Sequence, residues 1–127
     1  MIKHIGLAIH DPSEITNFYQ NVLGLTIEKE FTLTKDLNQK LFGFYEEVPV
    51  TRMSNNNMIL EIFVTTLPST NSYAHICVEV ENRESLIEKV KMNNYQCTVI
   101  KRNSHPLVFI QDKFGNNFEI MKKNNHD

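Results

Sequence analysis

The sequence lacks the features that mark several large classes of protein. Its 127 residues include two cysteines, Cys77 and Cys97, which are too few for a disulfide framework and do not form a Cys-x-x-Cys motif. The net charge is −2, and the longest runs of Lys and Arg are pairs, so there is no basic stripe for nucleic-acid phosphates. No apolar run approaches the ~18 residues of a membrane-spanning helix, and the first strand-like segment begins at the N-terminus, without room for a signal peptide. We therefore expect a cytoplasmic protein that binds neither nucleic acid nor membrane.

The two halves of the chain resemble each other, and each begins with a histidine. Residues 4–9 read HIGLAI and residues 75–80 read HICVEV. Each of these segments is followed by a polar break and a helix-like stretch, and each half ends on a strand that carries a glutamate among apolar residues. The length and the 41% hydrophobic content suit one domain with one core. We expect a single domain made of two modules, residues 1–66 and 73–123, with a disordered tail at 124–127.

Hydrophobic periodicity predicts the same order of elements, β-α-β-β-β, in both modules. In module 1 we expect a strand at 2–9, a helix at 13–23, a strand at 25–31, a short helix within 35–44 that ends at Gly43, and a hairpin of strands 48–53 and 58–65. In module 2 we expect a strand at 75–80, a helix at 84–92, and strands at 97–101, 107–111 and 117–122. The pattern indicates an α+β protein with eight strands and two main helices.

The alternation within the first strand places its histidine away from the packed face. Ile5, Leu7 and Ile9 lie on one side of the strand, and His4 lies on the other side together with small residues. The small residues leave space for a ligand beside His4. The same alternation in module 2 places His75 opposite Ile76, Val78 and Val80.

Four residues at matching places in the two modules form a candidate metal site: His4, Glu61, His75 and Glu119. Taken singly, each glutamate is more simply explained as a solvent-facing residue and each histidine as a hydrogen-bonded core residue. Taken together, His and Glu in otherwise apolar strands are costly to bury unless something pairs with them, and one divalent cation would satisfy all four. Imidazole and carboxylate ligands suit zinc, nickel, cobalt, manganese or iron(II).

Longer motifs give the chain a resemblance to a known family. The segments at 4–9 and 75–80, with Phe18-Tyr19-x-x-Val22-Leu23-Gly24 and Asp112-x-x-Gly115-Asn116-x-x-Glu119, resemble the vicinal oxygen chelate superfamily. The resemblance spans nearly the whole chain and is weakest over residues 32–57. It implies paired βαβββ modules that form a curved, cup-shaped, eight-stranded mixed sheet with the two main helices outside. It also implies that His4, Glu61, His75 and Glu119 are the ligands of one divalent metal ion.

Within that superfamily, the sequence most resembles glyoxalase I and methylmalonyl-CoA epimerase. The two histidine-containing strands look like those of the epimerase, and a glutamate at the position of Glu61 is what glyoxalase I shows. That fourth ligand disfavours extradiol dioxygenases and fosfomycin-type thiol transferases. The resemblance implies a lyase or isomerase that moves a proton alpha to a carbonyl through a metal-stabilised enediolate, with Glu119 as the main acid–base residue, Glu61 as its counterpart, and Glu46 or Glu47 as a possible second group.

Several alternatives stay open at this level. A metal-free protein of the same fold that binds a drug or antibiotic, as bleomycin resistance proteins do, is the second hypothesis, and a regulatory domain is the third. We expect a small-molecule substrate, and Arg52 and Arg102 are candidates for an anionic substrate tail. We also expect a homodimer, in which the metal site lies within one chain or is shared between two.

Overall fold

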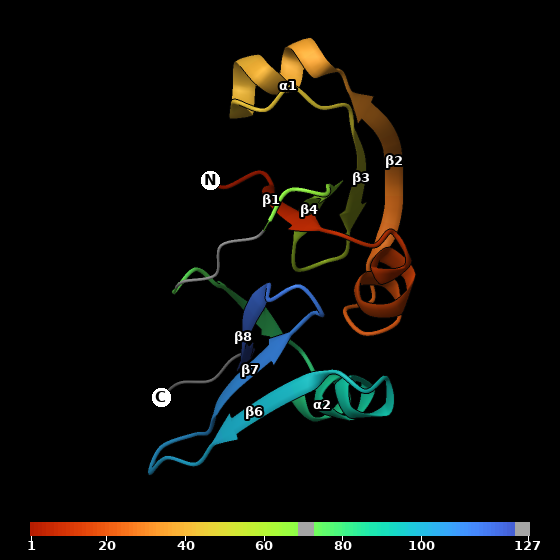
Figure 1. Cartoon of the computed structure of the whole chain (residues 1–127). Helices are drawn as coiled ribbons and strands as arrows, with labels where there is room; N and C mark the ends of the chain where they lie inside the picture. Colours follow the sequence, from red (N-terminus) through yellow and green to blue (C-terminus); the bar gives the residue numbers. More distant parts are fainter. Residues whose placement is uncertain (69–72, 124–127) are drawn as a thin grey trace.

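The structure is a computed structural model that describes residues 1–68 and 73–123. The N-terminal half and the C-terminal half of the chain form two separate modules that lie next to each other (Figure 1). The disordered tail predicted at 124–127 lies outside the described residues. No helix in the described ranges is long and apolar enough to cross a lipid bilayer.

Module 1 is a four-stranded mixed sheet with two helical segments. Its elements are β1 (Ile5–Ile9), the π-helix η1 (Ile15–Gln20), β2 (Thr26–Leu33), α1 (Lys35–Phe42), β3 (Val48–Ser54) and β4 (Ile59–Val64). The strand order is β1-β4-β3-β2. Strands β1 and β4 are parallel and the other pairs are antiparallel. The first strand of the module therefore lies beside the last one.

Module 2 repeats this topology without a counterpart of α1. Its elements are β5 (Ile76–Val80), α2 (Arg83–Met92), β6 (Gln96–Ile100), β7 (Leu107–Gln111) and β8 (Asn117–Lys122). The order β5-β8-β7-β6, with β5 and β8 parallel, matches that of module 1. The α+β class and the paired βαβββ modules are thus confirmed. The eight strands in the described part of the chain are divided between two four-stranded sheets, in which β1 and β5 lie at the edges.

The first helix differs from the expected one. The sequence predicts a helix over residues 13–23, and the chain is helical over residues 13–20, with a π-helix at Ile15–Gln20. Residues 21–23 then form a turn before Gly24, where φ is +71°. The amide of Leu23 donates to the carbonyl of Phe18, five residues earlier. Phe18 and Tyr19, which are adjacent in the sequence, are both fully buried.

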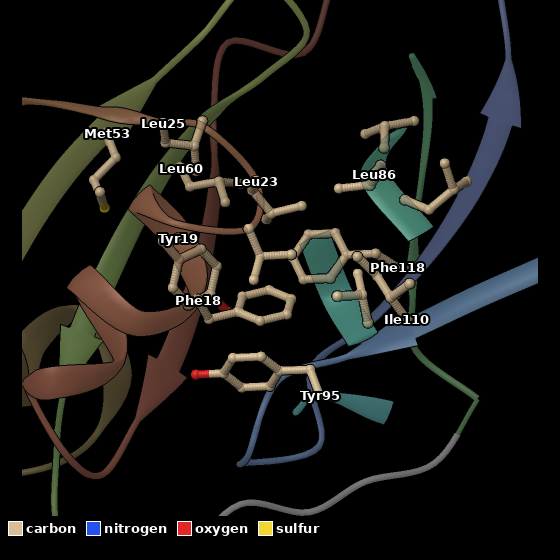
Figure 2. Close-up of a cluster of buried hydrophobic side chains, with 14 of the residues drawn as sticks. Phe18, Tyr19, Leu23, Leu25, Met53, Leu60, Leu86, Tyr95, Ile110 and Phe118 are labelled. Atoms are coloured by element: carbon tan, nitrogen blue, oxygen red, sulfur yellow. The ribbon is translucent and has the colours of Figure 1, made fainter. Parts of the chain in front are cut away.

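One hydrophobic cluster joins the two modules. Phe18 of η1 lies edge-on to Tyr95, with ring centroids 4.8 Å apart, and 5.9 Å from Phe118 of β8. Figure 2 shows Phe18, Tyr19 and Leu23 of module 1 facing Leu86, Ile110 and Phe118 of module 2. Helix η1 therefore connects the modules, because its buried side chains pack on both.

Buried polar contacts reinforce this junction. The carboxylate of Glu14, whose exposed fraction is 1%, accepts hydrogen bonds from the Tyr95 hydroxyl and, at 2.8 Å, from the Lys113 amide. The Tyr19 hydroxyl donates to Asp112 Oδ2 at 2.8 Å. Glu14 and Tyr19 belong to module 1, and their partners belong to module 2. Because buried polar groups need specific partners, these bonds determine how the modules meet.

Candidate functional site

In module 1, the parallel pairing of β1 and β4 brings the first predicted histidine and glutamate together. His4 directly precedes β1, and Glu61 lies opposite Gly6 in the register of β1 with β4. The distance from His4 Nε2 to Glu61 Oε1 is 3.3 Å. Ile5, Leu7 and Ile9 pack in or against the core, as the alternation predicted. His4 and Glu61 thus lie on the face of the sheet that is turned away from the core.

In module 2, β5 and β8 hold the second pair in the same way. His75 precedes β5, and Glu119 lies opposite Cys77. The distance from His75 Nε2 to Glu119 Oε1 is 3.4 Å. His75 Nδ1 lies 2.9 Å from the carbonyl oxygen of Tyr73. Because a carbonyl oxygen only accepts hydrogen bonds, this contact requires a proton on Nδ1. In the neutral imidazole, Nε2 then carries the lone pair that can bind a metal ion.

The surroundings of the two pairs differ. Arg52 of β3 is the register partner of Glu61, and its Nη1 lies 3.3 Å from Glu61 Oε2 and 3.5 Å from His4 Nδ1. Its Nε donates to Glu28 Oε1 at 3.1 Å. Hydrogen bonds from Ser54 and Arg52 lower the pKa of Glu28. A guanidinium therefore neutralises the carboxylate of module 1, and Glu28 holds that guanidinium in place.

In module 2, an aromatic residue occupies the position of Arg52. Phe109 of β7 is the register partner of Glu119, and its ring centroid lies 5.4 Å from that of His75. The His75–Glu119 pair therefore lies against an apolar wall and is not shared with a cation at this register position. The sequence predicts Arg52 as a residue that binds an anionic substrate tail, and its contact with Glu61 was not predicted.

A cavity of about 410 Å³ adjoins the His4–Glu61 pair. Its volume lies within the range of about 300–1,000 Å³ that is usual for small-molecule sites. The lining residues come from β1 and the residue before it, α1, the α1–β3 connection, β3, β4 and the segment after β4: His4, Gly6, Leu7, Ala8, Asn38, Phe42, Phe44, Val48, Glu61, Phe63, Thr65 and Leu67. Space beside His4 was predicted from the small residues of the first strand. The aromatic walls were not predicted, although Phe63 shares the Glu61 face of its strand.

The other candidate residues have structural contacts or lie near this cavity. His10 Nδ1 lies 2.8 Å from the carbonyl oxygen of Thr65, which secures the end of β1. Glu46 accepts from the hydroxyls of Thr65 and Thr66 at 3.3 and 3.2 Å, so it lies next to one cavity-lining residue. Arg102 donates to the carbonyl oxygen of His105 at 3.1 Å, within the β6–β7 connection of module 2.

The structure brings the four predicted ligands together as two pairs. Within residues 1–68 and 73–123 of one chain, no group of three or more His, Cys, Asp or Glu side chains could hold a metal ion. Each pair has a geometry that fits metal binding, because two ligands that are each ~2.1 Å from one ion lie roughly 3.0–3.4 Å apart. Each module thus brings together two of the four predicted ligands, and convergence of all four residues stays a prediction.

Comparisons with known proteins agree with this fold. The family model described as Glyoxalase/Bleomycin resistance protein/Dioxygenase superfamily matches residues 1–120. No curated protein matches the sequence. Similar solved structures include a glyoxalase family protein from Enterococcus faecalis, with 19% identity, a TM-score of 0.71, and coverage of 94% of this chain and 95% of that chain.

Fosfomycin resistance proteins are also similar in structure. FosX from Listeria monocytogenes has 16% identity and a TM-score of 0.72, over 96% of this chain and 92% of that chain. A FosX mutant from the same organism, complexed with Mn(II) and 1S,2S-dihydroxypropylphosphonic acid, has 15% identity and a TM-score of 0.70, over 95% and 88% of the two chains. At these identities the likeness establishes the fold, and the family model establishes the membership. The chain belongs to the glyoxalase/bleomycin resistance protein/dioxygenase superfamily, which is the vicinal oxygen chelate superfamily that its motifs resemble.

Proposed function

We propose that the protein is a metal-dependent enzyme of the glyoxalase I or methylmalonyl-CoA epimerase type, which moves a proton on the carbon next to a carbonyl group. The observation that carries this proposal is the presence, in each module, of one imidazole and one carboxylate within 3.4 Å, at matching positions of a parallel strand pair. Such donors suit zinc, nickel, cobalt or manganese. The Mn(II) in the FosX complex supports a divalent cation as the cofactor.

The complete centre in this proposal is shared between two chains. His4 and Glu61 of one protomer would face the partner's His75 and the partner's Glu119, and the symmetry of a dimer would create two such centres. Two features support this arrangement. Each module supplies two ligands, and β1 and β5, which adjoin the ligands, lie at the edges of their sheets. Strand edges carry backbone groups that can pair with a second chain.

In the proposed reaction, Glu119 moves the proton and Glu61 has a supporting role. A carboxylate within reach of the carbon can accept a proton from one side of the substrate and return it. Glu61 Oε2 lies 3.3 Å from the Arg52 guanidinium and its Oε1 lies 3.3 Å from His4, whereas the only such neighbour of Glu119 in the described residues is His75 Nε2, at 3.4 Å. Glu119 is therefore the less constrained carboxylate. When bound, the divalent cation would supply a Lewis acid that stabilises negative charge on the carbonyl oxygen.

Metal analysis and proton exchange test this function together. Protein purified without chelator should contain about one divalent ion per chain, as measured by plasma mass spectrometry. It should also exchange the α-proton of a carbonyl substrate for deuterium. The variant Glu119→Gln should retain its fold by circular dichroism and lose the exchange. A metal-free protein, or full exchange by Glu119→Gln, would refute the proposal.

A metal-free binding protein of the same fold is the second candidate. The observation that favours it is the Arg52–Glu61 ion pair, which neutralises one proposed ligand without a metal. In that case the cavity would sequester a small molecule. Absence of metal in the purified protein, combined with tight binding of an apolar ligand, would favour this candidate over the enzyme.

A further inference from the structure

The cavity beside His4 and Glu61 has one polar end and otherwise apolar walls. Among the described residues, His4 and Glu61 are the only ionisable ones that line it, and most of the others are aliphatic or aromatic. We propose that this cavity receives an uncharged, apolar group of the substrate, with an aromatic ring as the best fit, attached next to the atoms that react at the metal ligands. The proposal rests on the proposed function, because it assigns the substrate class of the same site.

The walls of the cavity are arranged to contact a flat apolar group. The Phe63 ring lies against Gly6, where an added Cβ would come within 3.2 Å of the ring. The Phe42 ring meets Phe63 edge-on, with centroids 5.6 Å apart and an interplanar angle of 75°. Two rings at right angles form a corner in which a third ring can pack edge-to-face or offset. Because Gly6 has no side chain, the Phe63 ring can pack directly on the backbone of β1.

Helix α1 supplies the outer wall, and it has no counterpart in module 2. Thr34 caps the helix by accepting from the Leu37 amide, and Gly43 ends it in the left-handed conformation, at φ +84°. The chain changes direction at Gly43, and the residues on either side of it, Phe42 and Phe44, both line the cavity. In module 2 the corresponding β6–β7 connection, residues 101–106, contains no helix. The cavity is thus a specific feature of one half of the repeat.

The polar residues in the wall are already bonded within the protein. The Asn38 side-chain amide donates to the Glu46 carbonyl oxygen at 2.8 Å, and the Thr65 hydroxyl donates to the Glu46 carboxylate at 3.3 Å. Arg52 is bound to Glu28 and Glu61 and does not line the cavity. A phosphate, phosphonate or carboxylate tail would need cationic donors inside the cavity. The lining therefore favours an uncharged group over an anionic one.

Binding of an apolar probe tests the cavity independently of catalysis. The neutral dye N-phenyl-1-naphthylamine can be titrated by fluorescence, and the sequence contains no tryptophan that would interfere. We expect saturable binding that Phe42→Ala weakens roughly tenfold, because it removes one aromatic wall. Leu41→Ala is the matched control, since Leu41 is the preceding residue of the same helix, is similarly exposed (60% against 54%), and does not line the cavity. Equal affinities of the two variants, or no saturable binding, would overturn the proposal.

Exchange measurements separate this proposal from the proposed function. The metal-loaded protein is offered 2-hydroxyacetophenone and hydroxypyruvate, two hydroxymethyl ketones that carry a phenyl and a carboxylate group. We expect deuterium exchange with a higher kcat/KM for the phenyl compound, and Phe42→Ala should raise its KM roughly tenfold. Faster exchange of hydroxypyruvate would overturn the cavity assignment while supporting the proposed function. Probe binding at the cavity without exchange of either ketone would support the cavity assignment and overturn the proposed function.

Discussion

Arg52 Nη1 lies 3.3 Å from Glu61 Oε2, whereas the register partner of the equivalent Glu119 is Phe109. The repeat is therefore symmetric in its histidines and glutamates and asymmetric in what surrounds them. A cation bound by Glu61 would lie near a guanidinium, while a cation bound by Glu119 would lie near an aromatic ring. In the proposed metal centre, this difference would affect the metal affinity and the division of roles between the two carboxylates.

Replacing Arg52 should strengthen metal binding. In Arg52→Gln, the affinity for Mn²⁺ should rise about fivefold, which corresponds to ~1 kcal/mol, because a partly exposed positive charge beside the ligands is removed. Isothermal titration calorimetry of chelator-treated protein measures the change, with Arg102→Gln as the control for loss of a distant positive charge. A weaker affinity in Arg52→Gln would mean that Arg52 mainly orients Glu61.

Mixing two inactive variants should restore metal binding if the centre is shared between chains. One variant carries His4→Ala and Glu61→Ala, and the other carries His75→Ala and Glu119→Ala. Each variant alone should bind no metal at the site. In a mixed dimer, the intact module 1 of one chain would meet the intact module 2 of the other, so a random mixture should recover about a quarter of the wild-type metal content.

The mixture must be prepared by co-expression or by joint refolding, so that chains can exchange. A mixture of separately folded proteins that is analysed at once serves as the control. If the wild type binds metal and the co-expressed mixture binds none, a centre shared in this way would be excluded.

Loss of the buried carboxylate at the module junction should destabilise the whole protein. Glu14→Ala leaves the Tyr95 hydroxyl and the Lys113 amide without their acceptor, so the free energy of unfolding should fall by about 3 kcal/mol. Tyr95→Phe removes one of these bonds together with its donor and should cost about 1 kcal/mol. Urea denaturation measures both values. A loss in Glu14→Ala no larger than that in Tyr95→Phe would show that the carboxylate does not hold the junction.

Stability should decline at alkaline pH because of two buried phenols. Burial, followed by the nearby Asp112 carboxylate, raises the pKa of Tyr19 well above 10.0. Burial and the bond to Glu14 raise the pKa of Tyr95 in the same direction. The folded state therefore binds these protons more tightly than the unfolded chain, so this contribution to stability is fully present below about pH 10 and is lost as the pH rises further.

Absorbance at 295 nm in a Tyr45→Phe, Tyr73→Phe variant reports only the two buried phenols, since the sequence contains four tyrosines and no tryptophan. Phenolate should form together with the loss of circular dichroism, as the protein unfolds. Reversible ionisation near pH 10 in the folded protein would contradict this expectation.

Most element positions could be predicted from local patterns. The strands at 107–111 and 117–122 have the predicted bounds, and α2 begins one residue before the expected helix at 84–92. The structure differs from the prediction in a segment that contacts residues far away in the sequence. The predicted helix at 13–23 ends at residue 20 and is π-helical over Ile15–Gln20, and Phe18 within it packs against Tyr95 and Phe118 of module 2. That contact involves residues about 75–100 positions away, which no local period encodes.

The sequence alone determined which side chains face the site, because alternation along a strand is a local property of the backbone. It therefore placed His4 and His75 on the faces opposite the aliphatic residues, and parallel pairing with the closing strands brought Glu61 and Glu119 beside them. Only the tertiary structure decided where the His4–Glu61 pair lies relative to the His75–Glu119 pair. In the described residues of one chain, the two His–Glu pairs lie in separate sheets, Arg52 contacts one of the carboxylates, and α1 lines an apolar cavity. These features depend on contacts between different elements, which a local sequence pattern does not encode.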